Sequence, residues 1–352
     1  MAEITTSEVR AFLSKIQGQE ISLPELRREF QIQQGTKSFD LIRNIMFQLA
    51  ELNVVRPTKR GYYKVVVEVK PVEVFGVERE RRPLFDLVFP KDKRTDLEIE
   101  FAGSVVIREG DLITMGGTKS SGKTLLCLNF CAENIDKRPV LMGNEYTIAI
   151  SDDGVDDKVA HKIIRYEPAP RFLNRLDVMR EWVNWVDENG KDKFTLLPVR
   201  EDYAEHIVKN RINIIDWINL GGDRLYDIGK VLESIKANLG RGIAIIALQK
   251  GEGATDPRGS QFVRDFSDLE LVLDPFGKGG DETLITIRGV KEKTEAIVGK
   301  TYAYYMGKGG TQILDFHEVS KCSICHGSGF VKGKECDTCL GKKYVGQGEE
   351  LL

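Results

Sequence analysis

The stretch that decides the fold is SVVIREGDLITMGGTKSSGKTLLCLNF, residues 104–130. A β-branched, apolar run at 111–115 precedes the glycine loop GTKSSGKT at 117–124, and the apolar, helix-like run 125–130 follows it. Strand, glycine loop and helix are the context that the phosphate-binding G-x-x-x-x-G-K-[ST] pattern requires. The stretch therefore predicts an α/β fold with a mostly parallel sheet and a phosphate site at this loop.

Each residue type in the loop has a physical task. The glycines let successive backbone amides turn towards phosphate groups, Lys123 adds a positive charge at the β and γ groups, and the Thr124 hydroxyl can ligate magnesium. The N-terminus of the following helix adds its partial positive charge. We therefore expect ATP and Mg²⁺ as ligands, with ATP held by Gly117, Thr118, Lys119, Ser120, Ser121, Gly122, Lys123 and Thr124.

Asp216 can supply the second acidic ligand that magnesium needs. It follows the apolar run RINII at 211–215, which reads as a buried strand. That run lies downstream of the glycine loop with helix-like segments between them, as a parallel sheet requires. We therefore expect Asp216 to contact the nucleotide and its magnesium ion. A helix N-cap or an ordinary surface carboxylate is the alternative.

The order of these runs resembles that of the RecA-like superfamily, which includes RecA and the DnaB-type replicative helicases, over about residues 97–317. The resemblance implies an ATPase in which Glu145, after the strand-like run RPVLMGNEY, activates the attacking water. Asp152 and Asp153 are rivals for this role. It also implies that Gln249, at the end of GIAIIALQK, senses the γ-phosphate. Positioning and charge stabilisation are what phosphoryl transfer asks of these groups and of Lys123.

Two further segments resemble parts of RecA and the hexameric helicases. The glycine-rich loop after Gln249 resembles a DNA-contacting loop, which implies DNA contacts by Lys250, Arg258 and Arg264. The hairpin-like run 282–306 carries Lys291 and Lys293, and these resemble residues inserted into a neighbour's ATP site. That role requires a homo-oligomer, a ring or a filament. Simple solvation of these charges is the alternative.

The N-terminal 70 residues predict three short helices followed by a two-stranded basic ribbon. Capping boxes at Thr5 and Ser22 mark two helix starts. The third helix, about 38–52, has an apolar face, and its other face carries Arg43. The order resembles winged helix-turn-helix domains, which implies DNA contacts by Arg43 on the helix and by Lys59 and Arg60 in the wing. Packing on the ATPase or on a protein partner is the alternative.

The C-terminus carries two C-x-x-C pairs, Cys322 with Cys325 and Cys336 with Cys339. Four such thiolates make a closed, tetrahedral zinc site of the structural kind. The glycines after each pair resemble the C-x-x-C-x-G-x-G repeats of DnaJ-type zinc domains, although the second pair lacks the last glycine. Redox chemistry is the alternative for paired cysteines. We expect a zinc-binding recognition module for nucleic acid or a protein partner.

These segments predict four parts: a winged-helix-like domain at 1–70, a charged linker at 71–96, a RecA-like ATPase domain at 97–317 and a zinc ribbon-like tail at 318–352. The chain of 352 residues has a net charge of −3, so any nucleic-acid binding must come from local basic patches. It has no secretion signal and no run long enough to span a membrane, and we expect a cytoplasmic protein without a membrane partner.

The leading functional expectation is an ATP-hydrolysing motor that acts on DNA in replication or recombination, either helicase-like or recombinase-like. The alternative is an ATP-switched, DNA-binding regulator that hydrolyses slowly and recruits partners. A kinase-like phosphotransferase is a weaker option, because the sequence carries no acceptor-site motif.

Overall fold

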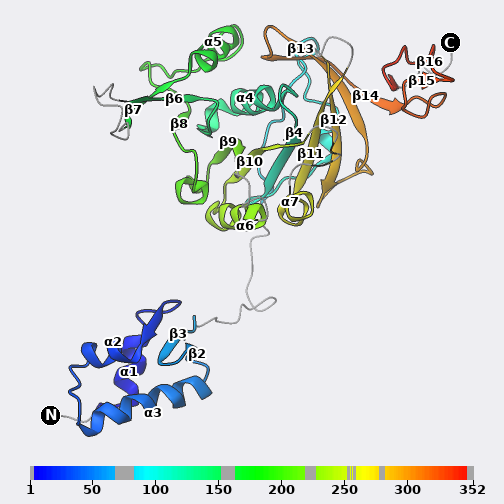
Figure 1. The fold of residues 1–352 in the computed structure, drawn as a ribbon. Coiled ribbons are helices and arrows are strands. Elements are labelled where there is room, and N and C mark those ends of the chain that lie inside the picture. The colour runs from blue at the N-terminus through cyan, green and yellow to red at the C-terminus, as the bar shows by residue number, and fades with distance from the viewer. Residues whose placement is uncertain are drawn as a thin grey trace, which may run out of the picture. The chain divides into compact units, whose positions relative to one another are not determined.

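The protein divides into two compact units, Met1–Arg79 and Glu80–Leu352 (Figure 1). The computed structural model describes residues 4–67, 83–151, 163–218, 227–251, 254, 256, 259–276 and 282–346. Arg258, Asp152 and Asp153, three of the residues singled out from the sequence, lie outside these ranges.

The first unit combines three helices with a small antiparallel sheet. Both predicted capping boxes form: the Thr5 and Ser22 hydroxyls accept from the backbone N–H of Glu8 and Glu25. A strand that the sequence reading did not anticipate, β1, pairs with β3 and makes the sheet three-stranded, in the order β1-β3-β2. The elements are α1 (Thr6–Leu13), β1 (Glu20–Ser22), α2 (Leu23–Glu29), α3 (Lys37–Glu51), β2 (Val55–Lys59) and β3 (Tyr62–Val65).

The second unit is built on a sheet that has ten strands within the described residues, in the order β17-β14-β13-β12-β11-β4-β10-β9-β5-β8. The run from β11 to β8 is parallel, and the run from β12 to β17 extends it antiparallel. The α/β fold class predicted from the sequence is confirmed. The parallel strands are β4 (Leu112–Gly117), β5 (Val140–Met142), β8 (Thr195–Leu197), β9 (Ile212–Ile218), β10 (Ile243–Gln249) and β11 (Leu269–Phe276).

Helices cover both faces of the parallel strands (Figure 1). Because successive strand residues point to opposite faces, Ile214 packs on the side of α4 and α5, whereas Ile215 packs on the side of α6 and α7. Burial on both faces explains why these strands read as continuous apolar runs. The helices are α4 (Lys123–Glu133), α5 (Pro170–Met179), α6 (Ile228–Asn238) and α7 (Ser260–Phe266).

The antiparallel strands join the C-terminal cysteine module to the central sheet. Strand β17 pairs with β14, with Val319 opposite Gly346, and the Tyr344 ring packs on that of Phe276 with centroids 6.0 Å apart. The module is therefore continuous with the sheet. The remaining strands are β12 (Glu282–Val290), β13 (Thr301–Gly307), β14 (Gln312–Lys321), β15 (Phe330–Val331), β16 (Lys334–Glu335), β17 (Tyr344–Gly346) and the separate hairpin of β6 (Thr147–Ser151) and β7 (Ile163–Pro168).

Residues 83–96, which the sequence reading assigned to a linker, pack on the second unit. Phe89 is buried between the rings of Phe101 and Phe130, at centroid distances of 6.0 and 5.6 Å. The Lys93 ammonium lies 2.6 Å from the Glu133 carboxylate at the end of α4. Apolar burial thus fixes this segment despite its many charges. Among the described residues, no helix is both long and apolar enough to cross a membrane.

Candidate nucleotide site and candidate metal centre

The glycine loop, residues 117–124, is called the P-loop from here on. It lies at the carboxyl end of β4, in the middle of the sheet. Strand β4 is fully buried between β10 and β11, and the loop leads directly into α4. Gly122 is the residue before this helix and has a φ of 87°, a left-handed conformation that favours glycine. The loop is thereby held where the backbone amides of the first turn of α4 are available to an anion.

Lys123 is bonded to the loop's own backbone. Its ammonium donates to the carbonyls of Gly117 and Thr118 at 2.9 and 2.5 Å, and only 7% of the residue is exposed. Burial lowers the pKa of this ammonium, and the nearby Asp216 carboxylate opposes the change. The side chain therefore sits at the floor of the loop, where it can reach a phosphate group after leaving these carbonyls.

Asp216 lies within β9 and is completely buried. Both of its carboxylate oxygens lack a hydrogen-bond partner among the described residues. Burial raises the pKa of this carboxyl to about 6, Glu145 adds to the shift, and the neighbouring Thr124 hydroxyl and Lys123 ammonium oppose it. Buried charged oxygens without partners are unusual unless a metal ion or another cation completes them.

The structure brings four sequence-predicted groups together in one pocket of about 790 Å³. The P-loop side chains, Asp216, Glu145 and Gln249 all line it, at the carboxyl ends of four neighbouring parallel strands, where open α/β sheets place their ligands. The volume is that of a small-molecule site. The complete lining is Lys119, Ser120, Ser121, Gly122, Lys123, Thr124, Leu125, Glu145, Arg171, Arg175, Asp216, Trp217, Ile218, Ile228, Leu248, Gln249, Met306, Gly309 and Gly310.

Two pocket residues, Arg171 and Arg175, were missed by the sequence reading. They lie one turn apart on α5. The only signal was the local run PRFLNR, in which proline starts a helix and the two arginines share a face. Neither guanidinium has a hydrogen bond or an ion pair among the described residues. The pocket thus has two cationic side chains besides its lysines.

Lys291 and Lys293 were expected to enter a neighbour's ATP site and are here called the finger lysines. They lie at the end of the sheet opposite the glycine loop. Lys291 pairs with Asp268 at 3.1 Å, and the N–H of Asp268 donates to the carbonyl of Leu112, at the start of β4. Lys293 is exposed, and its backbone forms an isolated antiparallel β-bridge with that of Val105. Because the P-loop follows the end of β4, neither lysine reaches the pocket of its own chain. Any action on a nucleotide would require a second copy.

The predicted DNA contacts of the second unit have different surroundings. Lys250 is only 4% exposed and is ion-paired with Asp274, so its ammonium faces protein in this structure. Arg264 is exposed but pairs with Asp256 at 3.2 Å and with Glu270 at 3.3 Å. These two residues would have to exchange carboxylate partners for phosphate groups.

The predicted DNA contacts of the first unit are open to solvent. Arg43 lies on the outward face of α3, and Arg60 lies at the tip of the β2–β3 hairpin. The Lys59 ammonium sits 4.0 Å from the centre of the Tyr62 ring. Residues 4–36 carry four basic and four acidic side chains, whereas residues 37–67 carry six basic and two acidic ones. The positive charge of this unit is thus concentrated on α3 and the hairpin.

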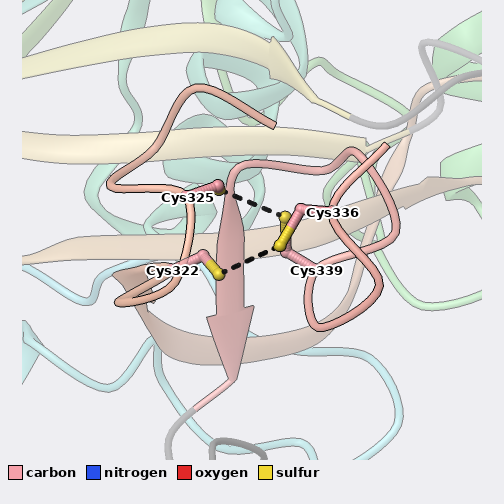
Figure 2. A group of neighbouring side chains, drawn as sticks. All are labelled: Cys322, Cys325, Cys336 and Cys339. Carbon is pink, nitrogen blue, oxygen red and sulfur yellow. Dashed lines mark hydrogen bonds between the residues drawn. The ribbon is translucent and has the colours of Figure 1, made fainter. Parts of the chain in front are cut away.

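The four C-terminal cysteines form one buried cluster (Figure 2). Their sulfur atoms all lie within 4.8 Å of one another, with Cys322 and Cys336 at 3.8 Å and Cys325 and Cys339 at 3.6 Å. Tetrahedral zinc with sulfur at about 2.3 Å separates its ligands by about 3.8 Å. Burial acts to raise the pKa of Cys325, but the Gly329 N–H and the other thiols lower it to about 6. The donor set therefore fits zinc.

The two halves of the cluster have matching backbones in spite of the missing glycine. Gly329, four residues after Cys325, has a φ of 81°, and its N–H donates to the Cys325 sulfur at 3.3 Å. Lys343 occupies the corresponding place after Cys339 and has a φ of 74°. The lysine thus adopts a left-handed conformation. Glycine would adopt the same conformation without steric cost.

Comparison with known proteins finds likenesses among solved structures only. No protein-family model matches the chain, and no curated protein matches it. Among solved structures, the chain is similar to the RadB recombinase, with a TM-score of 0.41 and 15% sequence identity. The match covers 59% of this chain and 91% of the recombinase chain.

Proposed function

We propose that this protein is a RecA-like ATPase that acts on DNA. The observation that carries the proposal is the pocket in which the P-loop, Asp216, Glu145 and Gln249 converge from four parallel strands. A cation at the loop, a buried carboxylate, an exposed carboxylate and a terminal amide are the groups that nucleotide hydrolysis uses. The order of the strands supports the RecA-like arrangement expected from the sequence.

Each of these groups has a distinct task in the proposed reaction. Lys123 and the loop amides hold the β- and γ-phosphates, and Thr124 and Asp216 are placed to hold Mg²⁺, which would offset phosphate charge when bound. Glu145 aligns and polarises the attacking water, and Gln249 contacts the γ-phosphate. The two unpartnered oxygens of Asp216 make this carboxylate the natural metal ligand.

The proposed site is completed by a neighbouring subunit. Lys291 and Lys293 lie at the opposite end of the sheet from the P-loop, so they serve as finger residues only in a homo-oligomer. Such a cation stabilises the charge that develops on the γ-phosphate. Hydrolysis is then coupled to contacts between subunits.

DNA binding is assigned to the basic part of the first unit. Its element order, with α3 followed by the β2–β3 hairpin, resembles a winged helix-turn-helix, and Arg43, Lys59 and Arg60 are exposed there. Arg264 and Lys250 contribute where their carboxylate partners give way to phosphate groups. Zinc at the four cysteines stabilises the C-terminal module rather than taking part in chemistry.

The direct test compares ATP binding and ATP turnover in matched variants. Lys123→Ala should abolish ATP binding. Glu145→Gln should keep ATP affinity and lower turnover by about a hundredfold or more, in the range measured for loss of a positioned catalytic group. Glu188→Gln, which changes an exposed glutamate outside the pocket, is the control. Unchanged turnover in Glu145→Gln would remove Glu145 from the mechanism.

A second candidate function is an ATP-switched regulator that hydrolyses slowly. The first unit, with its positive charge concentrated in residues 37–67, favours this function. The two functions differ in what DNA does to turnover. Single-stranded DNA should stimulate ATP hydrolysis by the proposed motor. If turnover ignores single-stranded DNA while duplex binding depends on ATP, the regulator is the correct function.

A further inference from the structure

Tyr304 of β13 places its phenol hydroxyl directly against the P-loop. A Cβ built on Gly122 would lie 2.7 Å from the Tyr304 Oη and 3.5 Å from the Thr283 Oγ1. Thr283 and Tyr304 are cross-strand partners in β12 and β13. The two hydroxyls, here called the hydroxyl pair, thus lie together against the residue that precedes α4. A side chain at position 122 would collide with Tyr304.

The hydroxyl pair is buried and lacks hydrogen-bond partners. Tyr304 and Thr283 are both 0% exposed, and neither hydroxyl has a hydrogen-bond partner outside the pair within the part of the chain that the structure describes. Buried polar groups are nearly always bonded, and a buried hydroxyl without a partner is destabilising. Burial raises the pKa of Tyr304, so its hydroxyl stays protonated and available as a donor at neutral pH.

The conformation of the P-loop explains why a partner is missing. The Lys123 ammonium donates to the carbonyls of Gly117 and Thr118, and the Ser121 hydroxyl also donates to Thr118 at 2.9 Å. The Thr118 carbonyl therefore faces the loop's own donors, whereas the Gly117 carbonyl is also held by the backbone N–H of Lys250 at 2.9 Å. A phosphate group in the loop requires the amides and the ammonium to face it instead. A loop carbonyl that turns away from the phosphate is then free to accept from the hydroxyl pair, which lies against Gly122 of the same loop.

We propose that Tyr304 is a positioning residue for the nucleotide-bound P-loop, whose hydroxyl donates to a loop carbonyl only when phosphate groups occupy the site. Thr283 supports it as the second member of the pair. The inference rests on the proposed nucleotide binding. Tyr304 does not line the pocket, so it acts through the loop backbone and not on the nucleotide itself.

The test is Tyr304→Phe, which removes one oxygen atom and keeps the ring. We expect the affinity for ATP and ADP to fall about fivefold, the effect of one net hydrogen bond. The melting temperature of the nucleotide-free protein should stay equal or rise, because a hydroxyl without a partner has been removed. Tyr302→Phe is the matched control, since Tyr302 is buried on the same strand and stacks on Phe316. It should leave nucleotide affinity unchanged.

Two results would overturn the inference. The first is an unchanged ATP affinity in Tyr304→Phe while the unsubstituted protein binds ATP. The second is a loss of affinity accompanied by a lower melting temperature of the nucleotide-free protein, because the hydroxyl would then be bonded in both states. Failure of the unsubstituted protein to bind ATP would instead overturn the proposed function, and this inference with it.

Discussion

The rings of Tyr146 and Phe172 pack together with their centroids 5.0 Å apart. Tyr146 follows Glu145, and Phe172 belongs to the first turn of α5. The N–H of Ala169 also donates to the Tyr146 carbonyl at 2.8 Å. These two contacts fix α5 against the end of β5. They explain how Arg171 and Arg175, which lie on either side of Phe172 in the same helix, come to line the nucleotide pocket.

Replacing either pocket arginine should weaken nucleotide binding. We expect Arg171→Ala and Arg175→Ala each to lower ATP affinity by about five- to thirtyfold, because a hydrogen bond from a charged group is lost in a partly exposed site. Titration with a fluorescent ATP analogue measures this. Arg180→Ala is the control: Arg180 caps the same helix, pairs with Asp177 and lies outside the pocket. Equal affinity in all three variants would exclude a role for these arginines.

Magnesium-dependent ATP binding should weaken in acid. Burial raises the pKa of Asp216 to about 6, so in the nucleotide-free protein this carboxyl takes up a proton as pH falls through 6. Magnesium needs the ionised form. Its apparent affinity should therefore fall about tenfold per pH unit below pH 6 and level off above about pH 7. Magnesium titrations between pH 5 and 8 measure the profile. An identical profile in Asp216→Asn would assign the titration to another group.

The proposed finger should act between subunits. Lys293→Ala should abolish turnover with little loss of ATP affinity, because the lysine lies outside its own chain's pocket. Mixing Lys293→Ala with the inactive Glu145→Gln should restore activity, since about a quarter of the sites in random closed assemblies would join an intact glutamate to an intact lysine. The hydrolysis rate of the mixture measures this. A mixture as inactive as its two components, or a Lys293→Ala protein with a large affinity loss, would contradict the role.

Removing the metal should destabilise the C-terminal module. We expect about one zinc ion per chain, and Cys336→Ser should lose it and lower the melting temperature. Metal analysis together with thermal unfolding measures both effects. Cys131→Ser changes a cysteine buried in α4, outside the cluster, and should keep its zinc. Purified protein with no zinc and an unchanged melting temperature in Cys336→Ser would make these cysteines ordinary core residues.

The first unit should bind duplex DNA through α3 and the β2–β3 hairpin. Lys59→Ala should weaken binding about equally for all sequences and reduce the salt dependence by about one counterion, the signature of a phosphate contact. Binding at several salt concentrations measures the slope. Arg10→Ala, on α1 and outside the basic segment, is the control of equal charge. Equal slopes for the two variants would mean that Lys59 makes no specific phosphate contact.

Local chemistry explains which features were accessible from the sequence. The P-loop, the capping boxes at Thr5 and Ser22, and the cysteine pairs are encoded by neighbouring residues, so their spacing was informative. Asp216, Glu145 and Gln249 could be placed together because parallel strands end at the same edge of a sheet. The predicted α/β class follows from the same apolar runs and is confirmed.

Other features depend on contacts between distant segments and left little trace in the sequence. Arg171 reaches the pocket because α5 is held by Tyr146; the local run PRFLNR indicates a helix but not where that helix packs. Strand β1 has only three residues, too few for a clear sequence pattern, and it is a strand because it pairs with β3. Phe89 is one aromatic ring in a charged segment, and its burial depends on Phe101 and Phe130. The left-handed φ of Lys343 likewise belongs to the turn that brings Cys339 into the cysteine cluster.

The pairing of β17 with β14 makes the last part of the chain a cover for a sheet edge. A protein shortened to residue 321 would keep β14 but lose β17, and the N–H and C=O groups that Val319–Lys321 direct towards β17 would be unpaired. The Phe276 ring would also lose its contact with Tyr344. A bare edge of this kind is a template for pairing with other chains. Truncation or loss of the metal should therefore be seen first as aggregation, even where the nucleotide pocket itself remains folded.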